Sequence, residues 1–521
     1  MAELILEESV HTSELPAQEY STFRRYMLLI IFCGAQFLDT VNVSSLYSAI
    51  PTMTKELGLS ESDSVWLISA YQLTFAALLL CSGRTSDIYN PKFVFVGGTF
   101  VLGIFSIGAG FADDKIALFV LRGLSGVAAA MTVPSAMTLL IRMFPEPGEQ
   151  ALAIGVYGSS AVLGTVIGLF IGAVFVQFAN WSWVFWFTAL VAIPISLIAL
   201  VLVPKQPEVV VKGSKIALLD LPGVSIITAA LLLLIFAFTS TGTKSWGSAT
   251  VLAPLVLGIV GIAAFFVWEA RIPAERAAFP PHIWRYPNFG ILFAVALSVI
   301  LWFTAVFYLI ITMWQGGYQW SPISAAVHFL PMGIVAGLIM IFSAPWTGGF
   351  EIKYVLIAAQ LLALAGTIIL PFANTEDKYW RLLIPGFIIG TAGASLLFVN
   401  TNVAIFRSTP KEIAGVVASI FNSALQLGSA VGVSIITSIQ LEVDKKNIGK
   451  NGANPYDGRA AGFWFLVGII AIEMLAVIVF YRTASQQTKT TDPEDNVKSD
   501  ASTMVDSGSV KLERNTTSAL A

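Results

Sequence analysis

The chain has 521 residues, of which 56% are hydrophobic and only 12% are charged, and its mean hydropathy is +0.79. A soluble domain usually has about 25% charged residues, so this composition excludes an ordinary soluble protein. The formal net charge of −3 and the lack of a basic cluster in the sequence argue against a nucleic-acid partner. The composition predicts a protein embedded in a lipid bilayer.

The N-terminal segment does not have the pattern of a secretory signal peptide. Residues 1–23 contain five glutamates and no lysine or arginine, whereas a signal peptide begins with basic residues and continues with an apolar run. Arg24 and Arg25 stand directly before the first apolar segment, and the positive-inside rule then places the N-terminus in the cytosol. We expect the first span to serve as the targeting signal.

Long apolar segments then follow one another along the chain. A membrane span needs about 20 mostly apolar residues. Fourteen segments fit this need: 26–50, 65–81, 93–112, 116–140, 151–176, 183–203, 221–240, 249–269, 289–312, 321–343, 353–372, 382–402, 413–438 and 461–482. An even number of spans predicts that both termini are cytosolic. Cys33 and Cys81 lie within the first two spans, so we expect reduced core residues and no disulfide.

Parts of the chain repeat after about half its length. Lys92 aligns with Lys353 at an offset of 261 residues, and Gly164 aligns with Gly428 at an offset of 264. Duplicated six-helix halves are a recurring plan of transporters. We therefore expect a cytosolic N-terminal tail (1–25), a six-helix half (26–203), a linker with two inserted transmembrane helices (204–288), a second six-helix half (289–482) and a disordered cytosolic tail (483–521).

Several short motifs occur in a fixed order on these spans. They are FLDTVNVSSLYSAIP in the first span, SGRTSDIYNPK after the second, LRGLSGVAAAMTVPSA in the fourth, WSWVFWF at the sixth and LLDLPG at the seventh. Together they resemble motifs of the major facilitator superfamily, and especially of its fourteen-span drug:proton antiporter family with fungal multidrug and aminotriazole-resistance transporters. The resemblance implies an all-α major facilitator fold with fourteen transmembrane helices.

Asp39 is the main candidate for proton coupling. It lies in the middle of the first span, where an ionisable group costs at least ~2.5 kcal/mol, so its presence favours a function. Gln36 and Asn42 lie three residues to either side and form one polar stripe with it. Removal from water favours the neutral carboxyl group, which suits a residue that binds and releases a proton. The alternative is that Asp39 only hydrogen-bonds a neighbouring helix.

Arg122 is the second candidate for proton coupling. It shares a face of the fourth span with Gly126 and Ala129, whose small size leaves room for a guanidinium group. Since Arg122 lies toward the outer end of the span, the alternative is that its side chain extends to the membrane surface. The family resemblance favours a role in proton coupling through a nearby acid.

Two further groups point to conformational change. Gly164, Gly168 and Gly172 in the fifth span follow a small-xxx-small pattern, which predicts close helix packing, and they resemble the antiporter motif of the family. The turn after the second span matches the family signature at Gly83, Asp87 and Lys92 and departs from it at Ile88, Asn90 and Pro91. We expect this turn to act as a conformational latch that is made in one state only.

The substrate cavity is predicted from polar and aromatic residues in the spans. Polar side chains at membrane depth usually face the protein interior, and Tyr71 is one of several aromatic residues near them. The candidates are Gln36, Asn42, Gln72, Phe185, Trp302, Asn400, Asn422, Gln426 and Glu473. Aromatic faces with few fixed charges suit apolar or weakly cationic organic molecules. For Glu473, a place in the cavity and a place in a helix seam are equally compatible with the sequence.

These observations favour a secondary transporter over other classes of protein. The sequence has no phosphate-binding loop and no metal-ligand cluster, so we expect neither an enzyme nor a cofactor, and a gradient must drive the process. Our interpretation is a monomeric, proton-coupled exporter of drugs or a secondary metabolite in the plasma membrane or, alternatively, the vacuolar membrane. Two alternatives remain: transport of a small ion or metabolite such as ammonium, borate or a siderophore, and a membrane sensor that transports nothing.

Overall fold

The structure is a computed structural model of the full chain. It describes residues 21–144, 146–204, 220–241, 244–273, 277, 279, 281–347, 350–409, 414–447 and 456–483. Every element of regular secondary structure in these residues is a helix. The predicted disordered tail (483–521) lies outside the described residues except for Thr483 at its start, and most of the predicted N-terminal tail does as well.

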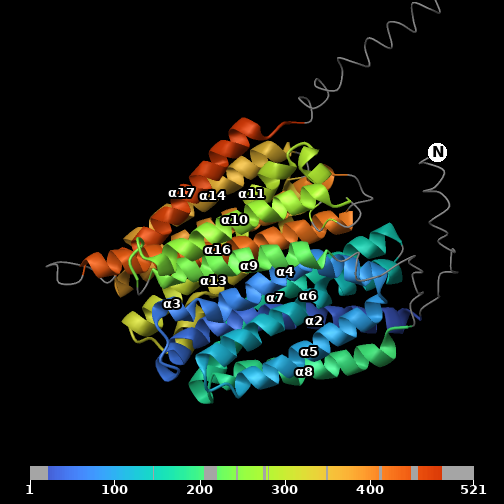
Figure 1. The fold of residues 1–521 in the computed structure, drawn as a ribbon, viewed down its shortest axis with the longest axis horizontal. Helices are drawn as coiled ribbons and strands as arrows, with labels where there is room; N and C mark the ends of the chain where they lie inside the picture. Colours follow the sequence, from blue (N-terminus) through green and yellow to red (C-terminus); the bar gives the residue numbers. More distant parts are fainter. Residues whose placement is uncertain are drawn as a thin grey trace, which may run out of the picture. The chain divides into compact units, whose positions relative to one another are not determined.

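The first eight predicted spans each coincide with one long helix (Figure 1). These helices are α2 (Thr22–Glu56), α4 (Trp66–Ile88), α5 (Pro91–Gly110), α6 (Lys115–Met143), α7 (Pro147–Phe178), α8 (Ser182–Leu202), α9 (Leu221–Ser240) and α10 (Ala249–Arg271). The short helix α3 (Glu61–Ser64) precedes α4, and the 3₁₀ turn η2 (Pro281–Arg285) follows α10.

The last six predicted spans are also helical, with more interruptions. They contain α11 (Phe289–Ile311), α12 (Pro322–His328), α13 (Leu330–Thr347), α14 (Ile352–Ile369), α15 (Ile384–Arg407), α16 (Ala414–Asn447) and α17 (Asp457–Phe480). α11 continues into a π-helical turn, η3 (Thr312–Gly317), and a second π-helical turn, η6 (Tyr379–Leu383), leads into α15. η4 (Leu370–Phe372) and η5 (Glu376–Lys378) are short 3₁₀ turns. The tenth predicted span is thus two helices, α12 and α13, that meet at Phe329, two residues before Pro331.

The length and apolar character of these helices confirm the predicted class of fold. Among the described residues, thirteen helical stretches are long and apolar enough to cross a membrane. The predicted second span is covered by α4, which has 23 residues. Helix starts follow local sequence: Pro91 opens α5 while the Asn90 side chain accepts a hydrogen bond from the Lys92 amide, and Asp114 caps α6. The protein is an all-α, multi-pass membrane protein.

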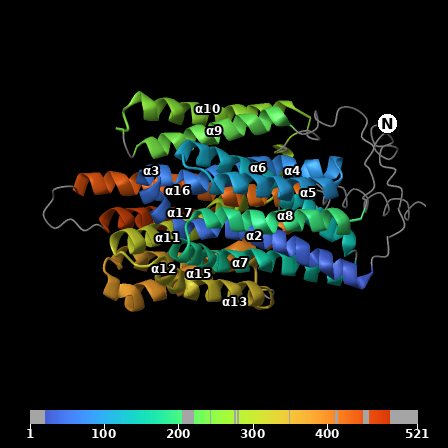
Figure 2. The same cartoon turned by 90° about the horizontal axis from the view of Figure 1, so that it is seen from below.

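The chain forms two compact units, and each has its own packing. The first contains residues 1–232 and 311–333, and the second contains residues 233–310 and 334–521. In the first unit α2 packs on α7, α4 on α6, and α5 on both α6 and α8, as Figures 1 and 2 show. In the second unit α14 packs on α15 and α17, and α16 also packs on α17. The predicted boundaries of the two six-helix halves stay a prediction.

The core of the first unit lies where α2, α5, α6 and α8 meet. Phe32 and Phe95 are fully buried there, with ring centroids 5.0 Å apart in an edge-to-face arrangement. Leu28, Leu139 and Ala199 belong to the same cluster. Burial of this apolar surface fixes the relative positions of the helices that carry the polar residues described next.

Candidate functional site

A polar cluster lies inside the first unit, between α2, α4 and α6. Asp39 and Asn42 project from the buried face of α2, and their exposed fractions are 6% and 0%. The hydroxyl group of Tyr71 on α4 donates a hydrogen bond to Oδ1 of Asp39. The tyrosine is buried as well, at 1% exposed. The predicted polar stripe of α2 therefore faces another helix, and its acidic residue has a hydroxyl partner there.

Arg122 of α6 enters the same cluster and is 1% exposed. Its Nε donates a hydrogen bond of 2.8 Å to the Leu67 carbonyl, and its Nη1 donates one of 3.0 Å to Oδ1 of Asn42. Its Cζ lies 4.5 Å from the centroid of the Tyr71 ring and 5.9 Å from that of Phe185, which are cation–π distances. The guanidinium group is thus held inside the protein and does not extend to the membrane surface.

Asp39 and Arg122 are close but do not form a direct ion pair. The ion pairs between side chains that the structure describes are Arg25–Glu149, Lys115–Asp63 and Lys446–Glu442. Tyr71 contacts both members of the cluster: its hydroxyl binds the acid, and its ring lies against the base. The acid is therefore linked to the base through an aromatic side chain.

Small residues on α6 allow this close contact. A Cβ atom at Gly126 would lie 2.3 Å from the Tyr71 carbonyl oxygen and 2.2 Å from Oγ1 of Thr74, so only glycine fits. The Thr74 hydroxyl also donates a hydrogen bond of 2.7 Å to the Gly123 carbonyl. The backbone of α6 thus lies directly on α4, which holds Arg122 against Tyr71.

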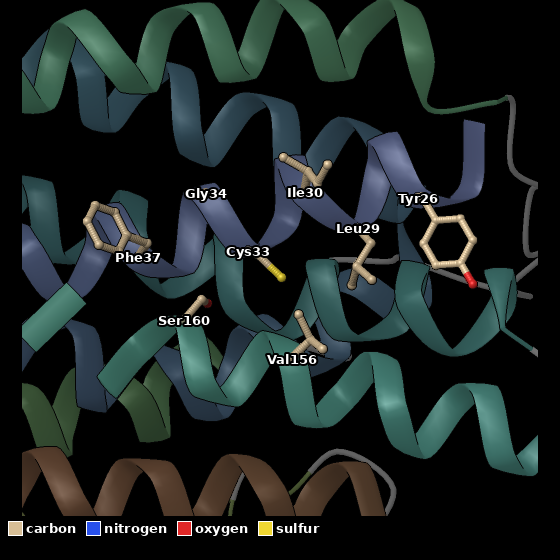
Figure 3. A pocket seen from close by; sticks show the side chains of 8 residues that line it. All are labelled: Tyr26, Leu29, Ile30, Cys33, Gly34, Phe37, Val156 and Ser160. Carbon is tan, nitrogen blue, oxygen red and sulfur yellow. The ribbon is translucent and has the colours of Figure 1, made fainter. Parts of the chain in front are cut away.

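On its other side, α2 is bound to α7. Tyr157 of α7 donates a hydrogen bond of 2.7 Å to Oε1 of Gln36, so this predicted cavity residue already has a partner. One turn closer to the N-terminus of α2, the Cys33 thiol lies beside the Ser160 hydroxyl. Both belong to the lining of an apolar groove of about 370 Å³. Figure 3 shows its lining residues, which are Tyr26, Leu29, Ile30, Cys33, Gly34, Phe37, Val156 and Ser160. The groove has no charged lining residue, and Asp39 is not part of it.

The predicted glycine stripe of α7 lies on α2. A Cβ atom at Gly164 would lie 2.0 Å from Oγ1 of Thr40, one at Gly168 would lie 2.0 Å from Oγ of Ser44, and one at Gly172 would lie 2.1 Å from the Ser45 carbonyl oxygen. Hydroxyl groups of α2 bond to the exposed carbonyls of α7: Ser44 to Gly164 at 3.2 Å and Ser48 to Leu169 at 2.9 Å. The two backbones are therefore in direct contact along this stripe.

The second unit repeats this arrangement. Gly428 and Gly432 of α16 lie against α11, where added Cβ atoms would be 1.8 Å from the Leu297 carbonyl oxygen and 2.4 Å from Cδ1 of Leu301. The residues aligned at the offset of 264 thus occupy equivalent helix contacts in the two units. The acid is not repeated, because α11 contains no aspartate or glutamate.

The other predicted cavity residues have varied surroundings. Gln72 follows Tyr71 on α4 and is buried. Trp302 donates a hydrogen bond of 2.8 Å from Nε1 to the Thr367 hydroxyl, within the contact of α11 and α14. Asn400 and Asn422 each donate to a carbonyl one turn earlier on their own helices, at 2.8 and 2.9 Å. The buried Oε1 of Gln426 has no hydrogen-bond partner within the described part of the chain.

The predicted latch consists of Gly83, Asp87 and Lys92, and the structure describes its backbone and some of its side chains. Gly83 lies on the last turns of α4, and Lys92 lies on the first turn of α5 and is half-buried. The side chain of Asp87 lies outside the described part of the structure. The latch therefore stays a prediction.

The sequence does not select Tyr157 or Gln360, and it gives Tyr71 no specific role. Tyr71 is selected from the sequence only as a nearby aromatic, and nothing in the sequence selects Tyr157. Gln360 of α14 is completely buried, and neither atom of its amide group has a partner in the described part of the chain. A glutamine inside an apolar span is a signal that could have identified Gln360, whereas tyrosines are too common in membrane spans to stand out.

Known proteins similar to this chain are transporters. The model of the Major Facilitator Superfamily matches residues 32–433. The puromycin resistance protein pur8 of Streptomyces alboniger is 28% identical and covers 90% of this chain and 93% of its own length. The multidrug transporter mfsC of Aspergillus fumigatus is 27% identical, covering 87% and 86%, and the efflux pump terJ of Aspergillus terreus is 26% identical, covering 87% of both.

Solved structures show the same fold at low sequence identity. A bacterial homologue of the human lysosomal transporter Spinster has a TM-score of 0.62 at 16% identity, with 88% of this chain and 98% of that chain covered. The human organic anion transporter MFSD10 has a TM-score of 0.57 at 14% identity, with coverage of 88% and 100%. With these matches, the chain is a membrane transporter of small molecules and not an enzyme, and it belongs to the Major Facilitator Superfamily.

Proposed function

We propose that this transporter exports small organic molecules, either drugs or a secondary metabolite, in exchange for protons by alternating access. The observation that carries the proposal is the buried acid Asp39, which is bound to Tyr71 and lies close to Arg122 without a direct ion pair. The names of the relatives support export: a puromycin resistance protein, a multidrug transporter and an efflux pump.

The chemistry of the cluster suits proton exchange. A carboxylate in a low-dielectric interior needs hydrogen bonds and a nearby cation, and Asp39 finds them in the Tyr71 hydroxyl and the Arg122 guanidinium. A proton on Asp39 removes the negative charge and weakens both interactions. Because the two protonation states differ in how strongly α2 holds to α4 and α6, protonation changes the relative stability of conformations.

The energy available from protons is sufficient for export. A proton that crosses a membrane potential of 100 mV releases about 2.3 kcal/mol. Each unit of pH difference adds about 1.4 kcal/mol. For a neutral cargo, one proton per cycle with a potential of 100 mV and a gradient of about two pH units therefore supports accumulation of roughly several thousandfold. For a cargo with one positive charge the exchange moves no net charge, so the pH gradient alone supports roughly a hundredfold.

The aromatic character of the buried surfaces supports a class of cargo. Phe185 already lies at a cation–π distance from Arg122, which shows that these rings can face a cation. We infer that the cargo consists of apolar or weakly cationic organic molecules, and puromycin is the first compound to test because one relative is named a puromycin resistance protein. A plasma-membrane or vacuolar location, cytosolic termini and a monomeric state belong to the same proposal.

Transport by the purified protein in liposomes tests the proposal. Puromycin and the fluorescent cation ethidium would be offered with the pH gradient imposed in each direction and with none. We expect the cargo to accumulate only when protons flow down their gradient in the direction opposite to cargo movement. Asp39→Asn should lose this accumulation. If each compound is transported at the same rate in all three gradient conditions, protons do not drive the process. Transport of neither compound, with transport of a small ion, would favour the alternative cargo.

A further inference from the structure

Glu473 lies deep in the second unit, on the buried stripe of α17. Leu466, Ile470 and Val477 of the same stripe are nearly inaccessible, at 0%, 4% and 0% exposed. The glutamate is half-buried, whereas the adjacent Ile472 is 68% exposed and in a bilayer faces lipid. The helix ends at Phe480, seven positions after Glu473, which is a distance of about 10 Å along the axis. The carboxyl group is therefore well inside the membrane.

The hydrogen bonds around Ser298 bear on the protonation state of this carboxyl group. The oxygen of the Ser298 hydroxyl lies 2.6 Å from Oε2 of Glu473 and 3.0 Å from the Val295 carbonyl oxygen. A hydroxyl group has one hydrogen, and neither a carbonyl nor a carboxylate can donate. Both contacts are hydrogen bonds at once if the carboxyl group carries a proton and donates it to Ser298, while Ser298 donates to Val295.

The charges around Glu473 agree with this arrangement. The titratable residues on the described parts of the helices that pack against α17 are Tyr308 on α11, Lys353 and Tyr354 on α14, and Glu442, Asp444, Lys445 and Lys446 on α16. Those on α14 and α16 lie near helix ends, and Lys353 donates to the Tyr481 carbonyl beyond the end of α17. No cation of the described chain forms an ion pair with Glu473. An isolated carboxylate at this depth is unfavourable, so the group becomes neutral by binding a proton.

We propose that Glu473 and Ser298 form a second proton-binding site, which holds a proton in the conformation described. The site places a proton-binding acid in the second unit, in addition to Asp39 in the first unit. Its ligand is the proton, which moves between Glu473 and water when the site becomes accessible. The use of this site in transport rests on the proposed function, whereas its occupancy does not.

Infrared spectra of the purified full-length protein in lipid nanodiscs test the occupancy directly. A glutamate in water is ionised at about pH 7. We expect the protein at that pH to show the C=O stretch of a protonated carboxylic acid, with the small downshift in D₂O that identifies an exchangeable proton. Glu473→Gln should remove this band. Ser298→Ala should move its frequency, because the acid loses its hydrogen-bond acceptor, and Asp39→Asn should leave it in place.

Each result bears on the proposal. Identical wild-type and Glu473→Gln spectra in the carboxylic acid region would overturn it. A band that Ser298→Ala leaves unmoved would overturn the pairing with Ser298, and Ser298→Ala retains the acid if Glu473→Gln does not fold. The spectra need neither cargo nor transport. A wild-type protein with the band but without pH-driven transport would contradict the proposed function alone, and pH-driven transport without the band would contradict the second site alone.

Discussion

The guanidinium carbon of Arg122 lies 4.5 Å from the centre of the Tyr71 ring, and the hydroxyl group of that ring donates a hydrogen bond to Asp39. One side chain of α4 therefore contacts the buried base of α6 and the buried acid of α2. In this arrangement the acid is close enough to sense the positive charge and is still free to take up a proton. Removing the hydroxyl and removing the ring should have different effects.

The first prediction concerns the acid. Asp39→Asn should fold and bind cargo, lose pH-driven accumulation, and keep exchange of labelled for unlabelled cargo, because the amide keeps the shape of the side chain and cannot cycle a proton. The measurement is uptake into liposomes with and without a pH gradient. Asp63→Asn is the matched control, since Asp63 pairs with Lys115 outside the cluster. Full pH-driven transport by Asp39→Asn would remove this residue from the mechanism.

The second prediction separates the two contacts of Tyr71. Tyr71→Phe removes only the hydrogen bond, and a hydrogen bond to a charged group contributes ~1.5–3 kcal/mol, so the pH-driven rate should fall by roughly tenfold or more. Tyr71→Leu also removes the ring from Arg122 and should cost more, because the acid and the base are then able to pair directly. Tyr26→Phe, at the exposed start of α2, is the control. Equal rates in Tyr71→Phe and the wild type would show that the hydroxyl group has no part in coupling.

The third prediction tests the contact between α2 and α7. A Cβ atom at Gly168 would lie 2.0 Å from Oγ of Ser44 and 2.9 Å from the Val41 backbone, whereas one at Gly158 on the same helix would meet nothing within 4 Å. Gly168→Ala should lower the melting temperature of the purified protein, while Gly158→Ala should leave it unchanged or raise it, since alanine favours a helix by about 1 kcal/mol over glycine. Similar melting temperatures for both variants would contradict the close contact.

The fourth prediction concerns Asp87, in the last turn of α4 before the connection to α5. If Asp87 makes a contact in one state only, Asp87→Asn should change the ratio of inward-open to outward-open molecules by roughly tenfold and lower turnover, because a charge-assisted bond of ~1.5–3 kcal/mol is lost. Distances between spin labels on the cytosolic side report the ratio. Binding of cargo by a state-locked form should hardly change. Weaker binding with an unchanged distance distribution would mean that the turn serves the cargo.

The sequence predicts the helices well because their signal is local. A run of about 20 apolar residues forms a membrane-spanning helix because of the lipid around it. The first eight predicted spans each coincide with one helix. The break at Phe329 is less visible, since Pro331 is compatible with either a kink or an interruption. Local composition thus fixes where helices occur better than where they bend.

The site was predictable only in part, because its partners come from different helices. Asp39 and Glu473 stand out in the sequence, since charge is rare at membrane depth. That Tyr71 binds the first and Ser298 contacts the second depends on how neighbouring helices are rotated and shifted against each other. This rotation and shift depend on packing along whole helices, as at Gly126 against α4. A short motif therefore does not predict them.

The contact of α2 with α7 also has a mechanical consequence. From Gly164 to Gly172 its surfaces consist of glycines on one helix and hydroxyl-bearing residues on the other, and the large side chains Tyr157 and Gln36 meet outside this stripe. The hydroxyls of Ser44 and Ser48 bond to backbone carbonyls of α7. Such a surface permits small sliding movements, known as shear, at little energetic cost. Asp39 travels with α2, so a slide of about one residue, 1.5 Å, would change its distance from Tyr71 while leaving the helices packed.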